Sequence, residues 1–422
     1  MKIGIFGLWH LGCVLAASWS KLGYNVVGYD YDHTNIDNLN NGKLPIFEPY
    51  LSEIIHHNLN KKFLNFTNDI NDLNDCDFVF LSYDTPVDDE DNSDTTILIN
   101  SIKNLSKTLK NDSIVIITSQ SPVGLCSELR EILKKYNSKL ELAYSPENLR
   151  LGEAIKCYLE PERIILGTNN KETEERCLEL FKVITSDIMC MNLESAEMVK
   201  HGINSFLATS IVFANHLADI CSEKGAKIKD VIEGMKSDPR IGEKAYLAPG
   251  IGFSGGTLGR DLKVLSKVNN KILQAGNWKP ASIFETIHDL NYDRKYSIIN
   301  KMKKHFDTIK GKNIGVLGLT YKPGTSTLRR SLPIEIINIS NKEGANIFAF
   351  DPKADYNELD ETNFKILNSI EELINNVDYI VLLTEWNEFK EFNWSLVDKK
   401  ISILDTKNFL TLNNPKIKYY TI

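Results

Sequence analysis

The stretch that decides the fold lies near the beginning of the chain, where residues 2–32 are KIGIFGLWHLGCVLAASWSKLGYNVVGYDYD. Lys2–Phe6 and Asn25–Tyr29 are short apolar runs, and each predicts a buried strand. Residues 11–22 lie between them and carry apolar residues at helical spacing. This strand–turn–helix–strand order is a βαβ unit, which predicts a parallel sheet in an α/β domain of the Rossmann kind.

The turn of this unit is GLWHLG (residues 7–12), which matches the dinucleotide pattern Gly-x-Gly-x-x-Gly at the first and third glycines. Gly7 allows the tight turn and Gly12 allows close helix–strand packing, but Trp9 replaces the glycine that lets a pyrophosphate approach the backbone. Asp30, which ends the second strand, can accept hydrogen bonds from a ribose diol and would repel a 2′-phosphate. The unit therefore favours NAD over NADP; the alternative is a Rossmann-like domain that binds no dinucleotide.

The same alternation continues along the chain. Apolar runs at residues 78–82, 114–118, 140–144 and 163–166 predict further strands of a parallel sheet. Residues 194–224 have helical apolar spacing without proline and predict a helix about 45 Å long. A second alternating region has predicted strands at Asn313–Leu317, Asn346–Phe350, 379–383 and 401–404.

We therefore predict an α/β protein with two Rossmann-like, doubly wound domains joined by a long central helix. The predicted cofactor domain covers residues 1–193, a central helical region covers 194–297, and a second Rossmann-like domain covers 298–422.

Composition narrows the class of protein. The 422 residues are 42% hydrophobic and 25% charged, as in ordinary globular proteins. The net charge of −7 gives no general electrostatic reason to bind nucleic acid. Seven cysteines without a Cys-x-x-Cys pair, no metal-ligand spacing, no signal peptide and no membrane-spanning run predict a metal-free cytoplasmic protein.

A glycine-rich stretch at residues 249–261, PGIGFSGGTLGRD, carries a family resemblance. It resembles the active-site loop of the UDP-glucose/GDP-mannose dehydrogenase family, Gly-Phe-Gly-Gly-Ser-Cys-Phe-Pro-Lys-Asp. Further matches to that family follow in order at residues 42–49 (GKLPIFEP), 84–86 (DTP), 121–124 (SPVG), 145–150 (SPENLR), 161–164 (PERI), 200–204 (KHGIN), 238–242 (DPRIG), 318–323 (GLTYKP), 382–386 (LLTEW) and 405–408 (DTKN). So many ordered matches make chance similarity a poor explanation.

The resemblance implies an NAD-dependent dehydrogenase that oxidises a nucleotide sugar, with a UDP-hexose oxidised at C6 as the expected substrate. It also implies a homodimer through the central helix, a nucleotide diphosphate in the C-terminal domain and a place in bacterial or archaeal surface-polysaccharide synthesis. The residues expected at NAD are Gly7, Trp9, His10, Leu11, Gly12, Asp30, Thr85, Pro86 and Gln120.

Groups suited to a first hydride transfer match the family. Lys200 and Asn204 lie one helical turn apart, so that a cation and an amide can stabilise a developing alkoxide. Asp261 is a candidate general base acting through water, and Glu147 is a second acid candidate.

Groups suited to the second half of the family's reaction are altered. Thr257 stands where the family has its nucleophilic cysteine, and a hydroxyl is a far poorer nucleophile than a thiol. Leu151 replaces a glutamate linked to thioester hydrolysis, and Gln120, Asn148 and Arg260 also depart from the pattern. We therefore expect hydride transfer to survive without thioester chemistry, which would stop the oxidation at an aldehyde or ketone.

The expected substrate contacts are divided between the central region and the C-terminal domain. Lys322 and Arg329 are candidates for a diphosphate, and Lys407 stands where the family usually has arginine. Arg240 matches an arginine that reaches substrate in the family. The residues expected to shape the sugar pocket are Tyr246, Leu247, Gly252, Phe253 and Gly255.

Two other interpretations stay open. The first is a complete four-electron dehydrogenase that works without a cysteine. The second is a catalytically silent nucleotide-sugar binder, which Trp9 favours and the retained Lys200, Asn204, Asp261 and Asp30 oppose.

Overall fold

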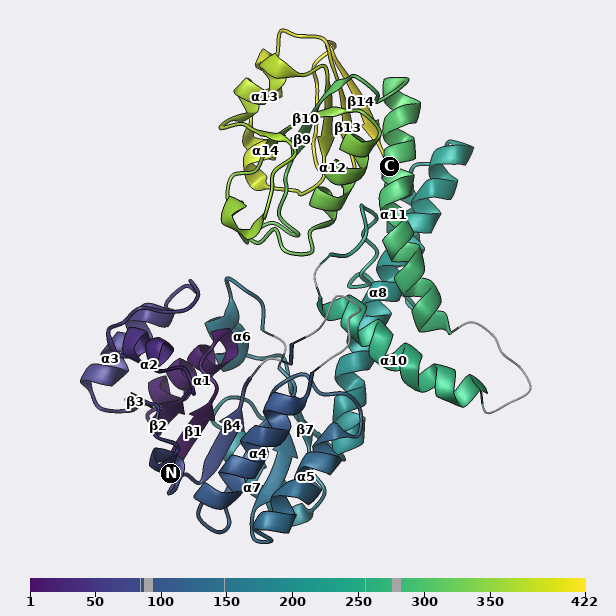
Figure 1. Cartoon of the computed structure of the whole chain (residues 1–422). Coiled ribbons are helices and arrows are strands. Elements are labelled where there is room, and N and C mark those ends of the chain that lie inside the picture. Colours follow the sequence, from purple (N-terminus) through teal and green to yellow (C-terminus); the bar gives the residue numbers. More distant parts are fainter. Residues whose placement is uncertain (84, 87–93, 148, 255, 275–281) are drawn as a thin grey trace. The chain divides into compact units, whose positions relative to one another are not determined.

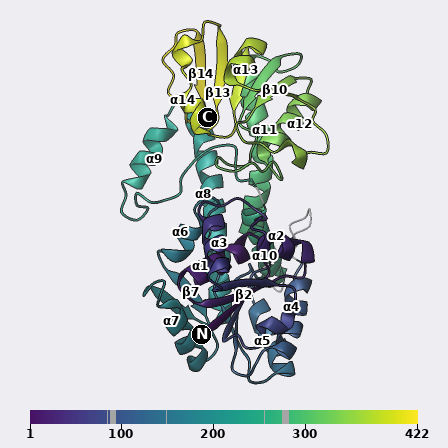
Figure 2. The ribbon, with the colours of Figure 1, turned by 90° about the vertical axis from the view of Figure 1, so that its left-hand side faces the viewer.

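The computed structural model describes residues 1–422 except 84, 87–93, 148, 255 and 275–281. The chain forms two compact units, Met1–Gly202 and Ile203–Ile422, called here the first and second units. Each contains a sheet with helices on both faces (Figures 1 and 2). This is the doubly wound α/β architecture that the sequence predicts, and the strands and the two helices predicted by residue range are confirmed to within one residue at each end.

The first unit is built on an eight-stranded sheet with the order β3-β2-β1-β4-β5-β6-β7-β8. Strand β1 pairs in parallel with both β2 and β4. The order of the strands therefore runs outward in one direction from β1 to β3 and in the other direction from β4 to β8, and the switch point lies between β1 and β4. Ligands of doubly wound sheets bind beyond the carboxyl ends of the strands at such a switch point. The strands are β1 Lys2–Phe6, β2 Asn25–Tyr29, β3 Leu64–Thr67, β4 Phe78–Leu81, β5 Ile114–Ile117, β6 Glu141–Tyr144, β7 Ile164–Gly167 and β8 Ile188–Met191.

One predicted feature of this sheet is wrong. Strand β7 pairs with β6 in the antiparallel direction, through Tyr144 and Gly167, and β8 then follows β7 in parallel. A short apolar run carries no signal for direction, and α6 (Ala154–Leu159) has only six residues. A parallel connection usually needs a longer crossover helix. The chain therefore runs back along the sheet at β7.

Two hydrophobic cores lie on the two faces of this sheet. On one face Trp19 packs against Phe80 and Phe181, with ring centroids 5.6 and 6.1 Å away. The helices of this face are α1 His10–Lys21, α3 Leu51–Asn60, α6 and α7 Lys171–Phe181. The helices of the other face are α4 Thr96–Thr108 and α5 Leu125–Tyr136, together with the start of α8. The short α2 (His33–Asn40) and η1 (Ile70–Leu73) complete the unit.

The predicted central helix is α8, Leu193–Lys224, whose 32 residues make it about 48 Å long. It begins in the first unit and ends in the second. The helices that follow α8 along the chain, before β9, are α9 Ile228–Lys236, α10 Thr257–Gln274 and α11 Ile283–Phe306. None of the helices in the described part of the chain has the length and apolar character needed to cross a bilayer.

The second unit has a six-stranded sheet with the order β11-β10-β9-β12-β13-β14, and every neighbouring pair is parallel. Helices α11 and α12 cover one face, and α13 and α14 cover the other. The elements are β9 Asn313–Leu317, α12 Leu332–Lys342, β10 Asn346–Phe350, η2 Tyr356–Glu358, β11 Lys365–Ile366, α13 Ile370–Asn376, β12 Tyr379–Leu382, α14 Asn387–Glu391, η3 Trp394–Leu396, β13 Ile401–Asp405 and β14 Ile417–Thr421.

Candidate functional site

The turn between β1 and α1 has the geometry of a dinucleotide turn. Gly7 has a φ of +102°, which favours glycine, and a Cβ there would meet the backbone nitrogen of Tyr83 at 3.0 Å. A Cβ on Gly12 would lie 1.8 Å from the carbonyl oxygen of Gly7. Both positions therefore require glycine, one for the turn and one for the close approach of helix and strand.

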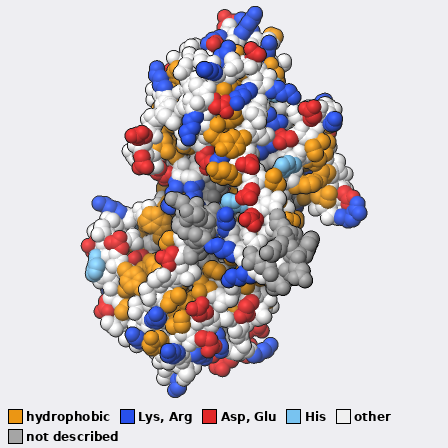
Figure 3. Space-filling view, turned by 45° about the vertical axis from the view of Figure 1, so that its right-hand side comes forward, with side chains coloured by type: hydrophobic (Ala, Val, Ile, Leu, Met, Phe, Trp, Pro, Cys, Tyr) orange, Lys and Arg blue, Asp and Glu red, His pale blue; other side chains and the backbone are white. Residues whose placement is uncertain are grey.

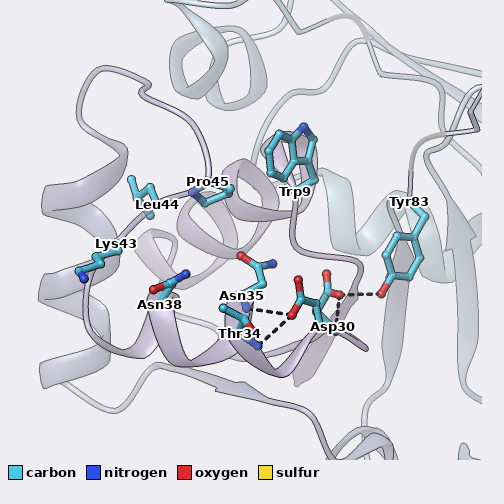
Figure 4. A pocket seen from close by; sticks show the side chains of 10 residues that line it. Trp9, Asp30, Thr34, Asn35, Asn38, Lys43, Leu44, Pro45 and Tyr83 are labelled. Atoms are coloured by element: carbon cyan, nitrogen blue, oxygen red, sulfur yellow. Dashed lines mark hydrogen bonds between the residues drawn. The ribbon is translucent and has the colours of Figure 1, made fainter. Parts of the chain in front are cut away.

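Trp9 does not distort this turn. Its φ of −86° and ψ of −155° are ordinary extended values, so glycine is not required there by backbone conformation. The side chain is 53% exposed and lines a cavity beside the turn. In Figure 4 the indole ring extends away from Asp30, on the side of Pro45. Trp9 therefore forms one wall of the pocket.

This cavity has a volume of about 450 Å³, within the range of small-ligand sites. Asp30 lies in it at the carboxyl end of β2 and is 7% exposed. Its Oδ2 accepts a hydrogen bond from the Leu8 nitrogen at 2.6 Å, and its Oδ1 accepts from the Tyr83 hydroxyl at 3.1 Å. An acidic group at this place fits the ribose of NAD, and the glycines fit its pyrophosphate. The lining residues are Trp9, Asp30, Asp32, Thr34, Asn35, Asn38, Lys43, Leu44, Pro45 and Tyr83.

The other residues predicted at NAD occupy the rim of the same turn and the ends of neighbouring strands. His10 begins α1, and its Nε2 lies 3.1 Å from Oε2 of Glu48. Leu11 packs against the core beside it. Thr85 donates its hydroxyl hydrogen bond to the carbonyl oxygen of Gln120 at 3.0 Å, which joins the ends of β4 and β5. Pro86 is exposed.

Glu48 is a buried carboxylate that the sequence places only within the GKLPIFEP motif. It accepts hydrogen bonds from the backbone nitrogens of Gly152 (3.1 Å) and Ala154 (2.7 Å), at the start of α6. Its contact with His10 therefore ties the cofactor turn to α6. The motif gave the signal for this residue, but the partners were not predicted.

Lys200 and Glu147 meet in the first unit. The ammonium group of Lys200 donates a hydrogen bond to the backbone carbonyl oxygen of Glu147 at 2.7 Å. Glu147 also lines a small cavity with Cys157, Tyr158 and Arg163. The carbonyl of the SPENLR motif thus positions the amine of Lys200 at the start of α8.

Asn204 and Asp261 meet in the second unit. Asp261 is fully buried on α10, and its Oδ2 accepts a hydrogen bond from the Asn204 amide on α8. Our expectation of a loop through Asp261 is wrong, because α10 already begins at Thr257. Buried Leu262 and Leu265 stabilise a helix there. Thr257 is exposed at its N-terminus, one turn before Asp261.

Side chains from two helices hold the glycine-rich loop that precedes α10. The Gly250 nitrogen donates to Oδ1 of Asn215 at 2.7 Å, and Nε of Arg294 donates to the Gly250 carbonyl at 2.9 Å. Asn291 makes two hydrogen bonds to the backbone of Phe253. Asn215 is a polar residue within the apolar pattern of α8, whereas Asn291 and Arg294 carry no signal in the sequence. Gly255 lies outside the described residues, as do Asp84 and Asn148.

The loop also contacts the C-terminal α/β part of the second unit. The Leu332 nitrogen donates to the Ser254 hydroxyl at 3.1 Å. The stem of Lys407 crosses Gly250 closely, since a Cβ there would lie 3.2 Å from its Cδ. The Lys407 ammonium lies 3.3 Å from a carboxylate oxygen of Glu385.

The remaining predicted substrate residues lie in three other segments of the second unit. Lys322 and Arg329 are exposed in the segment between β9 and α12. Desolvation of the ammonium group lowers the pKa of Lys322. Arg240 is on the surface, where its guanidinium pairs with Asp238 at 2.7 and 3.0 Å. Tyr246 is exposed and Leu247 is half-buried in the segment after α9.

The sequence places a single cysteine in the second unit. This cysteine, Cys221, is buried in a cluster with Ala218 and Ile228. In the first unit, burial raises the pKa of Cys13, Cys76, Cys126 and Cys177. These four thiols are therefore poor nucleophiles at neutral pH.

Charge and metal-ligand patterns add two observations. Over the face shown in Figure 3, lysine and arginine side chains lie among acidic and hydrophobic ones, without a continuous basic surface among the coloured residues. The described residues contain no group of three or more His, Cys, Asp or Glu side chains placed to hold a metal ion.

Comparisons with known proteins cover almost the whole chain. Residues 1–185 match the NAD binding domain of the UDP-glucose/GDP-mannose dehydrogenase family, 194–293 its central domain and 315–412 its UDP binding domain. The chain is 34% identical to UDP-glucose 6-dehydrogenase of Rickettsia prowazekii over 438 aligned residues, covering 100% of this chain and 99% of the relative. It is 30% identical to UDP-glucose 6-dehydrogenase TuaD of Bacillus subtilis, with 99% and 92% coverage.

Solved structures show the same fold. A UDP-glucose dehydrogenase from Pyrobaculum islandicum superposes with a TM-score of 0.88 at 22% identity, covering 99% of this chain and 96% of that one. A UDP-D-ManNAc dehydrogenase from Pyrococcus horikoshii superposes with a TM-score of 0.85 at 24% identity, covering 100% and 99%. With the ordered motifs and the paired glycines and Asp30 of the cofactor turn, these matches show that the chain belongs to the NAD-dependent UDP-glucose/GDP-mannose dehydrogenase family.

Proposed function

We propose that this protein oxidises the C6 hydroxymethyl group of a UDP-hexose and releases the aldehyde. The balanced reaction is R–CH₂OH + NAD⁺ → R–CHO + NADH + H⁺. The match of residues 315–412 to a UDP binding domain supports the nucleotide, and the curated relatives named UDP-glucose 6-dehydrogenase support the sugar position. NAD, when bound, supplies the hydride acceptor.

The retained polar residues have the chemistry for this single oxidation. The Lys200 ammonium and the Asn204 amide would stabilise the alkoxide that forms as the hydroxyl loses its proton. Asp261, which holds the Asn204 amide by a hydrogen bond, would accept that proton through a water molecule. Asp261 is completely buried, so its carboxylate is shielded from bulk solvent.

The observation that carries the two-electron limit is Thr257 at the N-terminus of α10. A second oxidation by the family's route needs a thiol that adds to the aldehyde, and a threonine hydroxyl is a much weaker nucleophile. The only cysteine of the second unit is buried in another cluster. Leu151 adds to the argument, because its side chain cannot transfer a proton to activate water.

The test is the stoichiometry of the reaction. The protein would be incubated with limiting UDP-glucose, UDP-N-acetylmannosamine or UDP-N-acetylgalactosamine and excess NAD, and a hydroxylamine would be added to trap the aldehyde only after NADH formation has stopped. One NADH per sugar and a trapped aldehyde are expected. Two NADH per sugar with a uronic acid would establish the four-electron alternative. UDP-sugar stabilisation in a thermal-shift assay without any NADH formation would establish a silent binder instead.

The protein is also proposed to act as a homodimer through α8. Phe206, Phe213 and Ile220 are 69%, 51% and 59% exposed, and they recur every seven residues along this helix. Large apolar side chains at heptad spacing form one stripe on a helix, which is stabilised when a second helix covers it. A second copy of the chain supplies an identical stripe.

The free cysteines favour a reducing compartment, and we propose the cytoplasm.

A further inference from the structure

The carboxylate of Asp30 has few free hydrogen-bond acceptor positions for a ligand. An ionised carboxylate offers about four acceptor positions. Three are taken, by the Leu8 nitrogen on Oδ2 and by the Asp32 nitrogen and the Tyr83 hydroxyl on Oδ1. A ribose diol that binds through both hydroxyls needs two positions, so it needs one that is already occupied.

The two backbone donors are parts of the fold. The Leu8 nitrogen belongs to the glycine turn, and the Asp32 nitrogen lies two residues from Asp30 at the cap of α2. Neither can move without disturbing the turn or the helix. The Tyr83 hydroxyl is the donor that a side-chain rotation can withdraw, and Figure 4 shows it pointing at Asp30 from the end of β4.

Tyr83 is held in place by a set of aromatic side chains. Its ring stacks on Tyr31 with centroids 5.6 Å apart and an interplanar angle of 14°, and it meets Phe6 edge to face at 5.7 Å. Its hydroxyl oxygen also accepts a hydrogen bond from the Tyr31 nitrogen at 3.3 Å. Burial, and then the charge of Asp30, raise the pKa of Tyr83, so the phenol remains a donor at neutral pH.

The second unit contains a similar arrangement, in which both oxygens of an aspartate accept hydrogen bonds from protein donors. Asp351, at the end of β10, accepts hydrogen bonds on Oδ2 from the Leu319 nitrogen (2.7 Å), from Thr320 and from the Trp386 indole (3.1 Å). Its Oδ1 accepts from the nitrogens of Lys353 and Ala354. Leu319 follows β9 by two residues, as Leu8 follows β1, and Trp386 lies four residues after β12, where Tyr83 lies two residues after β4. An aromatic donor can therefore satisfy this aspartate in the absence of any ribose.

We propose that the Tyr83 hydroxyl is an internal competitor for the adenosine ribose of NAD, occupying an acceptor position on Asp30 that the ribose diol requires. Binding of NAD displaces this hydrogen bond, and Tyr83 thereby sets the affinity of the pocket for the cofactor. The proposal rests on the NAD site of this unit and adds a residue that limits occupancy of that site.

The test compares Tyr83→Phe with Tyr31→Phe by calorimetric titration of NAD. Tyr31→Phe is the matched control, because its hydroxyl contacts Ser101 and Asn104 and not Asp30 within the described part of the chain, and the aromatic stack is kept in both variants. Tyr83→Phe should bind NAD about tenfold more tightly than the unaltered protein, the size expected when one competing charge-assisted hydrogen bond is removed. Tyr31→Phe should match the unaltered protein.

An NAD analogue whose adenosine ribose lacks both hydroxyls gives a second measurement. It does not compete for Asp30, so the gain from Tyr83→Phe should disappear with it. Equal or weaker NAD binding by Tyr83→Phe, with a melting temperature like that of Tyr31→Phe, would overturn the proposal alone. Absence of NAD binding by all three proteins would overturn it together with the proposed dehydrogenase activity.

Discussion

Asn291 holds the backbone of Phe253 on both sides. Its Oδ1 accepts a hydrogen bond from the Phe253 nitrogen at 2.8 Å, and its Nδ2 donates one to the Phe253 carbonyl at 3.0 Å. Gly252 makes this possible, because its φ is +106° and a Cβ there would lie 2.6 Å from the Asn291 oxygen. One amide of α11 therefore fixes the conformation of the glycine-rich loop just before Thr257.

Replacing Asn291 by alanine should release this loop. The two backbone groups of Phe253 lose their partners, and the free energy of unfolding should fall by about 2 kcal/mol. The value of kcat/KM for the UDP-sugar should fall at least tenfold, because the loop no longer has one conformation. Chemical denaturation and steady-state kinetics measure both effects. Asn300→Ala, an exposed position on the same helix, is the control, and an equal loss there would contradict the role of Asn291.

The strands could be predicted because each is a short apolar run between turn residues. Lys2–Phe6 and Asn313–Leu317 were predicted to the residue. The reversed direction of β7 could not be predicted, since four apolar residues look alike in both directions. The start of α10 at Thr257 could not be predicted, because the neighbouring glycines are typical of a loop, although Leu258, Leu262 and Leu265 have helical spacing.

The site divides in the same way. Gly7, Gly12 and Asp30 could be predicted as a cofactor turn because this motif is defined by local spacing alone. The contacts of Tyr83 with Asp30 and of Asn291 with Phe253 join residues 53 and 38 positions apart. Such pairs depend on which strand ends and helices become neighbours, and a single sequence contains no direct signal for that.

Thr257→Cys should restore the first part of the missing half-reaction. A thiolate is favoured at the N-terminus of α10, because the helix dipole lowers the pKa of a cysteine there. It should add to the aldehyde, and a second NAD⁺ should then take a hydride to leave a thioester. With Leu151 still present, hydrolysis stays slow, so about one extra NADH per enzyme and a covalent sugar adduct are expected.

Intact-mass spectrometry and a rapid-mixing NADH trace measure this burst. The double variant Thr257→Cys, Leu151→Glu should turn over and approach two NADH per sugar. Thr257→Ser is the control and should stay at one. If the unaltered protein already produces two NADH per sugar, the proposed two-electron limit is refuted.

The affinity for UDP should depend on the charge of Lys322. Desolvation lowers the pKa of this lysine, so it loses its proton at a lower pH than an ordinary lysine. The protonated form attracts the diphosphate, and affinity should therefore be present at neutral pH and decline as pH rises toward this lowered pKa. Lys322→Arg keeps its charge throughout that range.

The UDP affinities of the two proteins are compared by calorimetric titration between about pH 7 and pH 10. This pH range lies below the ordinary pKa of a lysine side chain. The difference between their affinities should widen with pH. Parallel curves would show that Lys322 does not bind the diphosphate through its charge.

Phe213→Glu should separate the proposed dimer. The phenylalanine is the middle member of the stripe formed with Phe206 and Ile220 on α8, and a carboxylate in a covered apolar stripe loses its water without gaining a partner. Two copies would also bring two like charges together at a symmetric interface. The molar mass measured by light scattering coupled to gel filtration should therefore fall from twice the chain mass of 47.9 kDa to the mass of one chain. Leu396→Glu, at an exposed apolar residue of η3, is the control and should remain dimeric. If Phe213→Glu stays dimeric as well, the interface lies on another surface.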